Sequence, residues 1–155
     1  MNCKRGGFIN ARHDSIRDFE ASLLSKACTD VETEPHLQPV TTETLSGRSS
    51  NTSADARLDI RARGFWRRGQ NAFFDVRVTN PDSASQVNSS IPSILRKHEE
   101  AKKREYNERV MQIEQGTFTP LVFTTTGSIG PECMLFHKSL AEQLATKSGE
   151  RYAYM

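Results

Sequence analysis

The 155-residue sequence predicts an α/β domain in which a mixed β-sheet is flanked by helices, with elements in the order α-β-β-β-α-β-α. The centre of the sheet is predicted to consist of two strands, at residues 56–63 and 72–79. In each segment apolar and polar side chains alternate, as they do in a half-buried strand. A charged helical segment separates the second of these strands from the apolar stretch 118–126. A helix that crosses between two strands of one sheet makes them parallel, so we expect one antiparallel and one parallel pairing.

The composition and charge exclude several classes of protein. The chain fits one domain, and no apolar run approaches the roughly 20 residues that a membrane-spanning helix needs. The first residues lack the apolar core of a secretory signal, so we expect an intracellular protein without a membrane partner. Cys3, Cys28 and Cys133 contain no closely spaced pair and supply neither a disulfide framework nor a complete zinc site. The net charge is only +2, but residues 56–80 carry six arginines against two aspartates.

Three helices are predicted from apolar residues that recur every three or four positions. The first covers 11–29, with an apolar side formed by Ile16, Phe19, Leu23, Leu24 and Ala27. Ser90 and Pro92 are helix-start signals, and the helix that follows them runs to about residue 115, where Gly116 closes it. Pro131 opens the last helix, which ends near residue 149 and buries Cys133, Phe136, Leu140 and Leu144.

The remaining segments connect these elements. Residues 34–40 are predicted to form a short strand, which Pro35 and Pro39 confine to the edge of the sheet. The Ser/Thr-rich residues 41–55 are predicted to be a flexible surface insert within the same domain. The stretch GFWRRGQN at 64–71, with a glycine near each end, suits a long hairpin between the two alternating strands.

Asp59 and Asp75 lie inside the two alternating strands, where a buried carboxylate without a partner is costly. Asp75 and Arg77 leave the same face of one strand, and Asp59 shares that face if the strands pair with their apolar faces aligned. The carboxylates could pair with arginines across the strands, an exposed contact worth less than about 1 kcal/mol. Alternatively, the two carboxylates could bind a hard divalent cation, with Arg77 beside it. Mg²⁺ is the cation that suits such a site best.

Short and long stretches of the sequence resemble one group of nucleases. LDI at 58–60 and DVR at 75–77 resemble the PD-(D/E)xK motif of restriction-endonuclease-like nucleases, whose core runs helix, three strands, helix, strand. The longer stretches CKRGGFINARHDSIRD, ARGFWRRGQNAFFDVRVTNP and EQGTFTPLVF resemble the carboxy-terminal region of reverse-transcriptase-bearing transposable-element proteins of invertebrates. In non-LTR retrotransposons this region is a restriction-like endonuclease that nicks target DNA and follows a zinc knuckle.

The resemblance implies a role for individual residues. Asp59 and Asp75 match the metal-binding acidic residues, and Arg77 stands at the lysine position. KKREY resembles the basic-plus-tyrosine motif of the next helix, which implies a catalytic role for Lys103 and Tyr106. The implied cofactor is Mg²⁺ or Mn²⁺.

Two positions depart from the motif. Leu58 replaces the motif proline, which is a mild change. Arg77 replaces lysine, and a guanidinium stays protonated and cannot serve as a general base. Arginine could still orient the attacking water or counter phosphate charge, so the motif is compatible with an active nuclease and with an inactive nucleic-acid-binding relic.

Other side chains are secondary candidates. Glu20, on the polar side of the first helix, could add a carboxylate to the metal site or could be solvated. His13 could be a general base or a structural residue. Trp66, Arg67 and Arg68 at the hairpin tip combine an aromatic plane with two cations, which favours nucleic-acid contact, although the tryptophan could equally pack on the sheet. The arginine-rich strand extends the predicted nucleic-acid surface with Arg57, Arg61 and Arg63.

The predicted organisation and function follow from these residues. Residues 1–10 are expected to be the remnant of an upstream zinc knuckle or linker, with Cys3 as a knuckle ligand, and residues 11–150 a single restriction-endonuclease-like domain. The expected function is nicking of target DNA in the nucleus, with DNA or RNA as partner and a reverse transcriptase upstream. A non-catalytic nucleic-acid-binding domain and a structural or protein-interaction module remain the alternatives.

Overall fold

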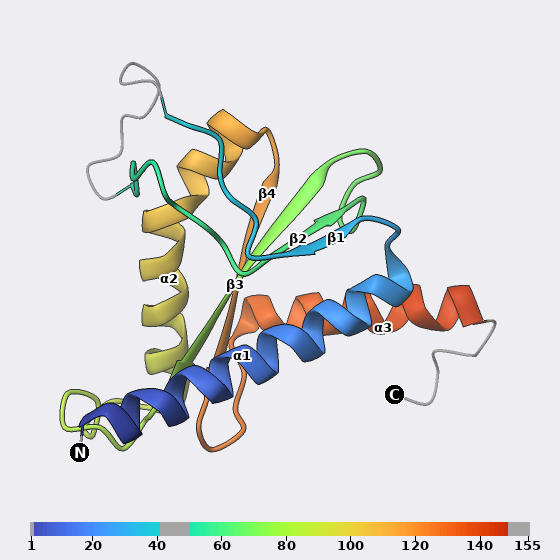
Figure 1. The fold of residues 1–155 in the computed structure, drawn as a ribbon. Helices are drawn as coiled ribbons and strands as arrows, with labels where there is room; N and C mark the ends of the chain where they lie inside the picture. The colour runs from blue at the N-terminus through green and yellow to red at the C-terminus, as the bar shows by residue number, and fades with distance from the viewer. Residues whose placement is uncertain (1, 41–49, 149–155) are drawn as a thin grey trace.

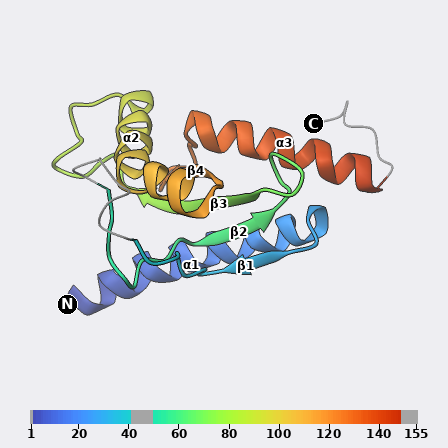
Figure 2. The ribbon, with the colours of Figure 1, turned by 90° about the horizontal axis from the view of Figure 1, so that it is seen from above.

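Four strands form one mixed sheet in the order β1-β2-β3-β4, as Figure 2 shows from above. The structure is a computed structural model that describes residues 2–40 and 50–148, with residues 2–9 described by their backbone alone. Its elements, in chain order, are α1 (Asn2–Ala27), β1 (Val31–Thr33), β2 (Ile60–Arg63), β3 (Asn71–Thr79), α2 (Ile91–Arg109), the π-helical turn η1 (Val110–Glu114), β4 (Thr117–Thr124) and α3 (Pro131–Ser148).

The strand pairing confirms the predicted mixed sheet. β2 and β3 form an antiparallel hairpin, with Ile60 opposite Phe74. β3 and β4 are parallel over their whole length, from Ala72 opposite Thr117 to Thr79 opposite Thr124. The connection between them is α2, which begins at the predicted signal: the Ser90 side chain accepts a hydrogen bond from the Ser93 amide.

Helices cover both faces of the sheet, and each face has its own core. α1 and α3 pack against each other and against one face, whereas α2 lies against the other face and meets α3 at Glu132 (Figure 1). The first core joins α1 and α3 to residues such as Ile60, Phe74 and Phe136. The second core lies against α2 and contains Leu37, Ala56, Leu58, Phe73, Tyr106, Val110 and Phe118. The sequence showed one apolar face per strand, but β3 buries both because its neighbours Phe73 and Phe74 enter different cores.

β2 and β3 separate at Asp59, and this fork decides where the polar side chains go. The Asp59 amide donates to the Phe74 carbonyl over 3.1 Å, although Ile60 is the registered partner of Phe74. One extra residue therefore faces Phe74, which interrupts the alternation, so Leu58 enters the second core and Ile60 the first. Beyond the fork, residues 75–79 of β3 pair with β4 only, and the other edge of β3 is open.

Several predicted boundaries around the first helix are wrong. α1 begins at Asn2 and ends at Ala27, whereas the predicted helix covered 11–29. Phe19, predicted to be buried, is 60% exposed, and Glu20, predicted to be polar surface, is 2% exposed. The first strand is three residues at 31–33 rather than 34–40, where only His36 forms an isolated bridge, to Arg57. Proline interrupts the ladder there, as it lacks an amide proton.

The predicted flexible insert is only partly described. Residues 41–49 lie outside the described residues. Residues 50–55 are fastened to α2, because the Asn51 amide donates to the Glu105 carbonyl over 2.8 Å and the Asn51 side chain donates to Tyr106 Oη. None of the helices within the described ranges is long and apolar enough to cross a membrane.

Arg109 is a fully buried cation that joins these connections, and no pattern in the sequence predicts its burial. Its guanidinium donates to the carbonyl oxygens of Gln38, Asn51 and Ser53 over 2.8 to 3.0 Å. Burial lowers the pKa of Arg109 from its usual value. The charge is tolerated because three carbonyl dipoles point at it, and it joins the two segments that flank residues 41–49 to the end of α2.

Replacing Arg109 by alanine is expected to lower the free energy of unfolding by about 3 kcal/mol or more, because three carbonyls in a buried setting lose their donor. Urea denaturation followed by circular dichroism measures this. Arg104→Ala, at an exposed position of the same helix, is the matched control and is expected to change the stability by less than about 0.5 kcal/mol. Equal effects of the two substitutions would contradict the structural role of Arg109.

Candidate active site

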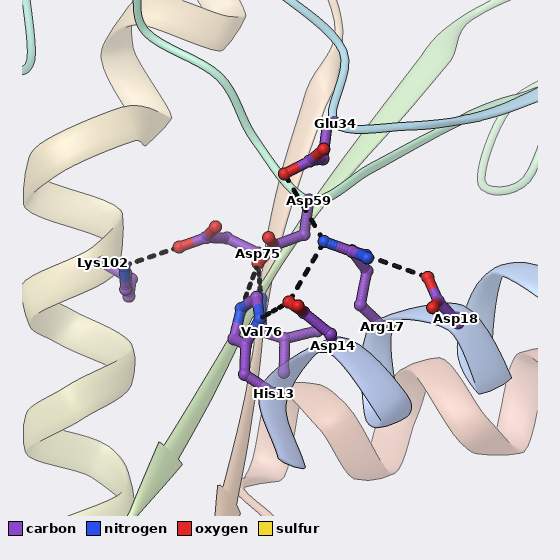
Figure 3. Close-up of polar contacts among 9 residues, drawn as sticks. All are labelled: His13, Asp14, Arg17, Asp18, Glu34, Asp59, Asp75, Val76 and Lys102. Atoms are coloured by element: carbon purple, nitrogen blue, oxygen red, sulfur yellow. Dashed lines mark hydrogen bonds and ion pairs between the residues drawn. The ribbon is translucent and has the colours of Figure 1, made fainter. Parts of the chain in front are cut away.

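Asp59 and Asp75 meet at the fork between β2 and β3, where their side chains lie close enough for each to shift the pKa of the other (Figure 3). Asp59 is the residue just before β2, and Asp75 is the first residue of β3 beyond the fork. The side chains are 13% and 9% exposed, respectively. The two aspartates that the sequence predicted to share one surface therefore do so, in a nearly buried setting.

The Asp59 carboxylate is fixed by the open edge of β3. Its Oδ2 accepts a 2.6 Å hydrogen bond from the Val76 amide and a 3.1 Å hydrogen bond from His13 Nε2. A main-chain amide at an unpaired sheet edge needs an acceptor, and here a side chain supplies it in place of the next strand. His13 comes from α1, so the first helix and the central strand hold this carboxylate together.

The Asp75 carboxylate faces α2. Lys102 Nζ lies 2.7 Å from Asp75 Oδ2, an ion pair without hydrogen-bond geometry, and that oxygen is buried without a hydrogen-bond donor. Lys102 also lies over the Tyr106 ring, 5.7 Å from its centroid. The cation beside the aspartates thus comes from the middle helix, and one carboxylate oxygen keeps unused acceptor capacity.

The surroundings shift the pKa values of the two aspartates in opposite directions. Burial raises the pKa of Asp75 to about 7, with Asp59 raising it further and Lys102 lowering it. Burial acts in the same direction on Asp59, but the hydrogen bonds of His13, Asp75 and the Val76 amide outweigh it and lower the pKa of Asp59. The hydrogen bond to Asp59 raises the pKa of His13 to about 9. At neutral pH His13 is charged, Asp59 is ionised, and Asp75 is balanced between its protonated and ionised forms.

A second ring of charges surrounds the α1 side of the pair. His13 Nδ1 contacts Asp14 over 3.1 Å. Arg17 forms ion pairs with Asp14, Asp18 and Glu34 at 3.2, 3.0 and 3.5 Å (Figure 3). Arg17 joins α1 to the turn after β1 and so contributes to positioning His13, one helical turn before it.

The other three predicted catalytic residues, Arg77, Lys103 and Tyr106, do not contact the two aspartate side chains through any hydrogen bond or ion pair among the described residues. Arg77 is exposed on the open part of β3 and makes no ion pair within the described residues. Lys103 points away from the aspartates and pairs with Glu132 over 2.5 Å. Tyr106 lies in the second core beside Lys102, where burial raises the pKa of its hydroxyl to about 12.

Lys102 was missed by sequence reasoning, which chose its neighbour Lys103. A signal was available, because Lys102 continues a stripe along α2 whose members are three or four residues apart: Leu95, Glu99, Tyr106 and Arg109 are all buried. That stripe faces the sheet. Lys103 lies one position away from it and reaches the beginning of α3 instead.

Glu20 lies between α1 and α3 and not beside the aspartates. Its Oε1 accepts a 2.5 Å hydrogen bond from His137 Nε2, while Oε2 is buried without a donor. His137 in turn lies 3.8 Å from the buried thiol of Cys133. The expected contribution of Glu20 to a metal site therefore has no geometric support, since its carboxylate pairs with a histidine of α3.

Cys28 and Cys133 are both buried and free.

Only some of the residues of the predicted nucleic-acid surface are exposed and without an ion pair among the described residues. Arg61 is engaged by Asp30 and Glu32, each over 3.1 Å. Trp66 folds back on the sheet, where its indole donates to Thr119 Oγ1 over 3.1 Å and its ring meets Phe65 edge to face. The arginines that remain exposed, without an ion pair among the described residues, are Arg57, Arg63, Arg67 and Arg68.

The donor set at the fork fits a hard divalent cation that is only partly coordinated by protein. Two neighbouring carboxylates ionise together only when positive charge compensates them, and Asp75 Oδ2, which lies 2.7 Å from Lys102 Nζ, still lacks a hydrogen-bond donor. Mg²⁺ uses one or two carboxylates and keeps water and phosphate oxygens as its other ligands. Within residues 10–40 and 50–148, no group of three or more histidine, cysteine, aspartate or glutamate side chains is arranged to hold a metal ion.

No protein-family model matches this chain, and no curated protein is significantly similar to it.

The raised pKa of Asp75 predicts that the protein without metal loses stability as the pH rises. A carboxyl with a pKa of 3.8 in the unfolded chain and about 7 in the fold stays protonated only in the folded protein between those values. Folding is therefore favoured at the acidic end of this window, and the advantage is lost as the pH rises through about 7. Between about pH 5 and about pH 8 the expected loss is roughly 1–3 kcal/mol.

Asp75→Asn tests this expectation, because the amide is neutral throughout the range and can donate to Asp59 as the protonated carboxyl does. Urea denaturation in the presence of a chelator, at several pH values, measures both proteins. His13 titrates in both and cancels in the comparison. The prediction is wrong if the difference in unfolding free energy between the two proteins stays the same at every pH.

Proposed function

We propose that the chain is a metal-dependent endonuclease domain of the PD-(D/E)xK, restriction-endonuclease-like class, which nicks DNA as part of a transposable-element protein. The observation that carries the proposal is the meeting of Asp59 and Asp75 at the fork of β2 and β3, beside Lys102. The motif resemblance of residues 58–60 and 75–77 supports the same class, as does the helix, three strands, helix, strand order.

Asp59 and Asp75 would hold the metal ion, for which Mg²⁺ or Mn²⁺ has the right preference for oxygen ligands. When bound, such an ion lowers the pKa of a water molecule and neutralises charge on a phosphate. The nearly buried setting of both carboxylates strengthens their interaction with a cation, because little water screens it. The proton that Asp75 holds below its raised pKa is what a cation would displace.

The chain's own residues orient this chemistry. The Val76 amide and His13 both bind Asp59 Oδ2 and so fix the position of that carboxylate beside Asp75. Lys102 has the charge and position to stabilise an anionic phosphate oxygen, a role that the sequence assigned to Arg77 and Lys103. With Lys102 on α2 supplying the cation, arginine at position 77 does not by itself remove the activity.

The second candidate function is a non-catalytic nucleic-acid-binding domain. The observation that favours it is the ion pair of Lys102 with Asp75, which balances that carboxylate without a metal. In both candidates the partner is a nucleic acid in the nucleus, reached through the exposed arginines of the sheet and hairpin, and a reverse transcriptase would accompany the domain. The two candidates differ only in hydrolysis.

Plasmid nicking tests the enzyme directly. With Mg²⁺ present, the chain is expected to convert supercoiled plasmid to the open circle, and a chelator is expected to abolish this conversion. Asp75→Asn is expected to lower the nicking rate by at least about 100-fold, the scale seen when one group that stabilises the transition state is lost. Asp82→Asn makes the same chemical change at an exposed loop position and is expected to leave the rate unchanged.

The outcomes separate the two candidates. A chain that never nicks in Mg²⁺ or Mn²⁺, or that nicks equally well as the Asp75 variant, is not this nuclease. If such a chain still binds duplex DNA with an affinity that falls as salt rises, the non-catalytic binding domain is the function. Circular dichroism of each variant shows that the comparison is between folded proteins.

A further inference from the structure

The open edge of β3 carries a group of basic side chains, of which the proposed metal chemistry uses only Lys102. Arg77 belongs to β3, and Lys97, His98 and Lys102 belong to the adjoining face and turn of α2. Of these, Lys102 forms an ion pair with Asp75, whereas neither Arg77 nor Lys97 makes an ion pair among the described residues. Positive charges gathered without an acidic partner favour an anionic ligand.

The contacts of β3 with α2 fix the position of Arg77. Side chains two residues apart leave the same face of a strand, so Asp75, Arg77 and Thr79 all face α2. Asp75 contacts Lys102 at 2.7 Å, and Thr79 Oγ1 contacts His98 Nε2 at 3.1 Å. Arg77 therefore stands between these two contacts, opposite the helical turn 98–102, and its exposed guanidinium reaches solvent there.

His98 is held in a defined orientation. The Gln86 amide nitrogen donates to Asn80 O and Ser83 Oγ, so its oxygen faces His98 Nε2 at 2.9 Å. That oxygen can only accept, which places a proton on Nε2 of the neutral ring. Nδ1 has no partner within residues 10–40 and 50–148 and is the nitrogen available to take up a second proton.

The surroundings keep His98 neutral in the absence of a ligand. Burial lowers its pKa, and the charges of Arg77, Lys97 and Lys102 lower it further. These three cations are the charged groups that act on the ring from β3 and from α2. The nearest carboxylate of the site, Asp75, is already paired with Lys102, so an added anion would reverse the balance of charge at His98.

The main chain contributes to the same edge. The Val76 amide points to the open side of β3, where Asp59 accepts it. Alternate residues of a strand direct their amides to the same side, so the amide of Val78 also points to this edge, beside Arg77. The Val78 amide and the Arg77 guanidinium thus lie immediately beyond the aspartate pair as donors that suit phosphate oxygens, and His98 on α2 becomes a third donor when its Nδ1 takes up a proton.

We propose that Arg77 and His98 form a subsite for a backbone phosphate of the nucleic acid, adjoining the phosphate at the aspartate pair, and that His98 takes up a proton from solvent when the subsite is filled. The inference rests on the proposed function, since it places the nucleic-acid strand along β3 from Asp75 toward Thr79. Arg77 lies about 7 Å along the strand from Asp75, so one strand can contact both positions. The arginine that cannot act as a base thereby has a binding role.

The test measures binding of a fluorescent duplex oligonucleotide by anisotropy, with a chelator present so that no cleavage occurs. Arg77→Gln is expected to weaken binding several-fold and to reduce the slope of log affinity against log salt by about one. Arg104→Gln, an exposed arginine elsewhere on α2, is the matched control and is expected to retain the slope. Because Arg77 is exposed, its substitution does not threaten the fold.

His98→Gln tests the proton. The affinity of the unchanged protein is expected to rise as the pH falls from about 8 to about 6, by up to about tenfold for each pH unit. In His98→Gln this rise is expected to be smaller, while affinity near pH 8 is retained, since glutamine can still donate to Gln86. His13 and Asp75 titrate in both proteins, so the difference between them isolates His98.

The outcomes distinguish this subsite from the proposed nuclease. Equal salt slopes for Arg77→Gln and Arg104→Gln, or equal pH dependence with and without His98, overturn the subsite even if the Asp75-dependent nicking is found. Absence of any binding of the oligonucleotide overturns it as well. A slope and pH dependence specific to Arg77 and His98 support the subsite even if the chain never nicks plasmid, in which case the nuclease alone is rejected.

Discussion

The hydrogen bond from the Val76 amide to the Asp59 carboxylate is the contact on which the site depends. β2 leaves β3 at this point, so the amide of a central strand would otherwise face an open edge without a partner. A carboxylate in this place completes the strand's hydrogen bonding and is itself brought against Asp75. The same contact thus ends the antiparallel pairing, opens one edge of β3 and creates a pair of adjacent carboxylates.

Charge balance around that pair is distributed over three elements. α1 supplies His13, α2 supplies Lys102, and β3 supplies Asp75 itself. A pair of buried carboxylates cannot both ionise without compensation, so the fold places His13 beside Asp59 and Lys102 beside Asp75. Each carboxylate thus has one cation supplied by the protein, and this is the charge balance that the proposed metal ion would change.

How much of the fold could be predicted differs between the elements. The mixed sheet, the β2–β3 hairpin and the crossover helix followed from alternation and helix-start signals, because those patterns report directly on burial and capping. Phe19 and Glu20 were assigned to the wrong environments, because the packing of α1 against α3 buries Glu20 beside His137. Arg109 was also unpredictable, since the carbonyls that bind it come from residues more than 50 positions away.

The sequence by itself determined that Asp59 and Asp75 belong to the two arms of one hairpin, because the alternation of apolar and polar residues marks both segments as strands. Only the tertiary structure decided which cation faces them. Lys102 and Lys103 are adjacent and chemically identical, and their roles are divided by the rotation of α2 about its axis, which the second core fixes through Tyr106 and Phe118. Rotation of a helix depends on its packing partners, and no local pattern of residues encodes it fully.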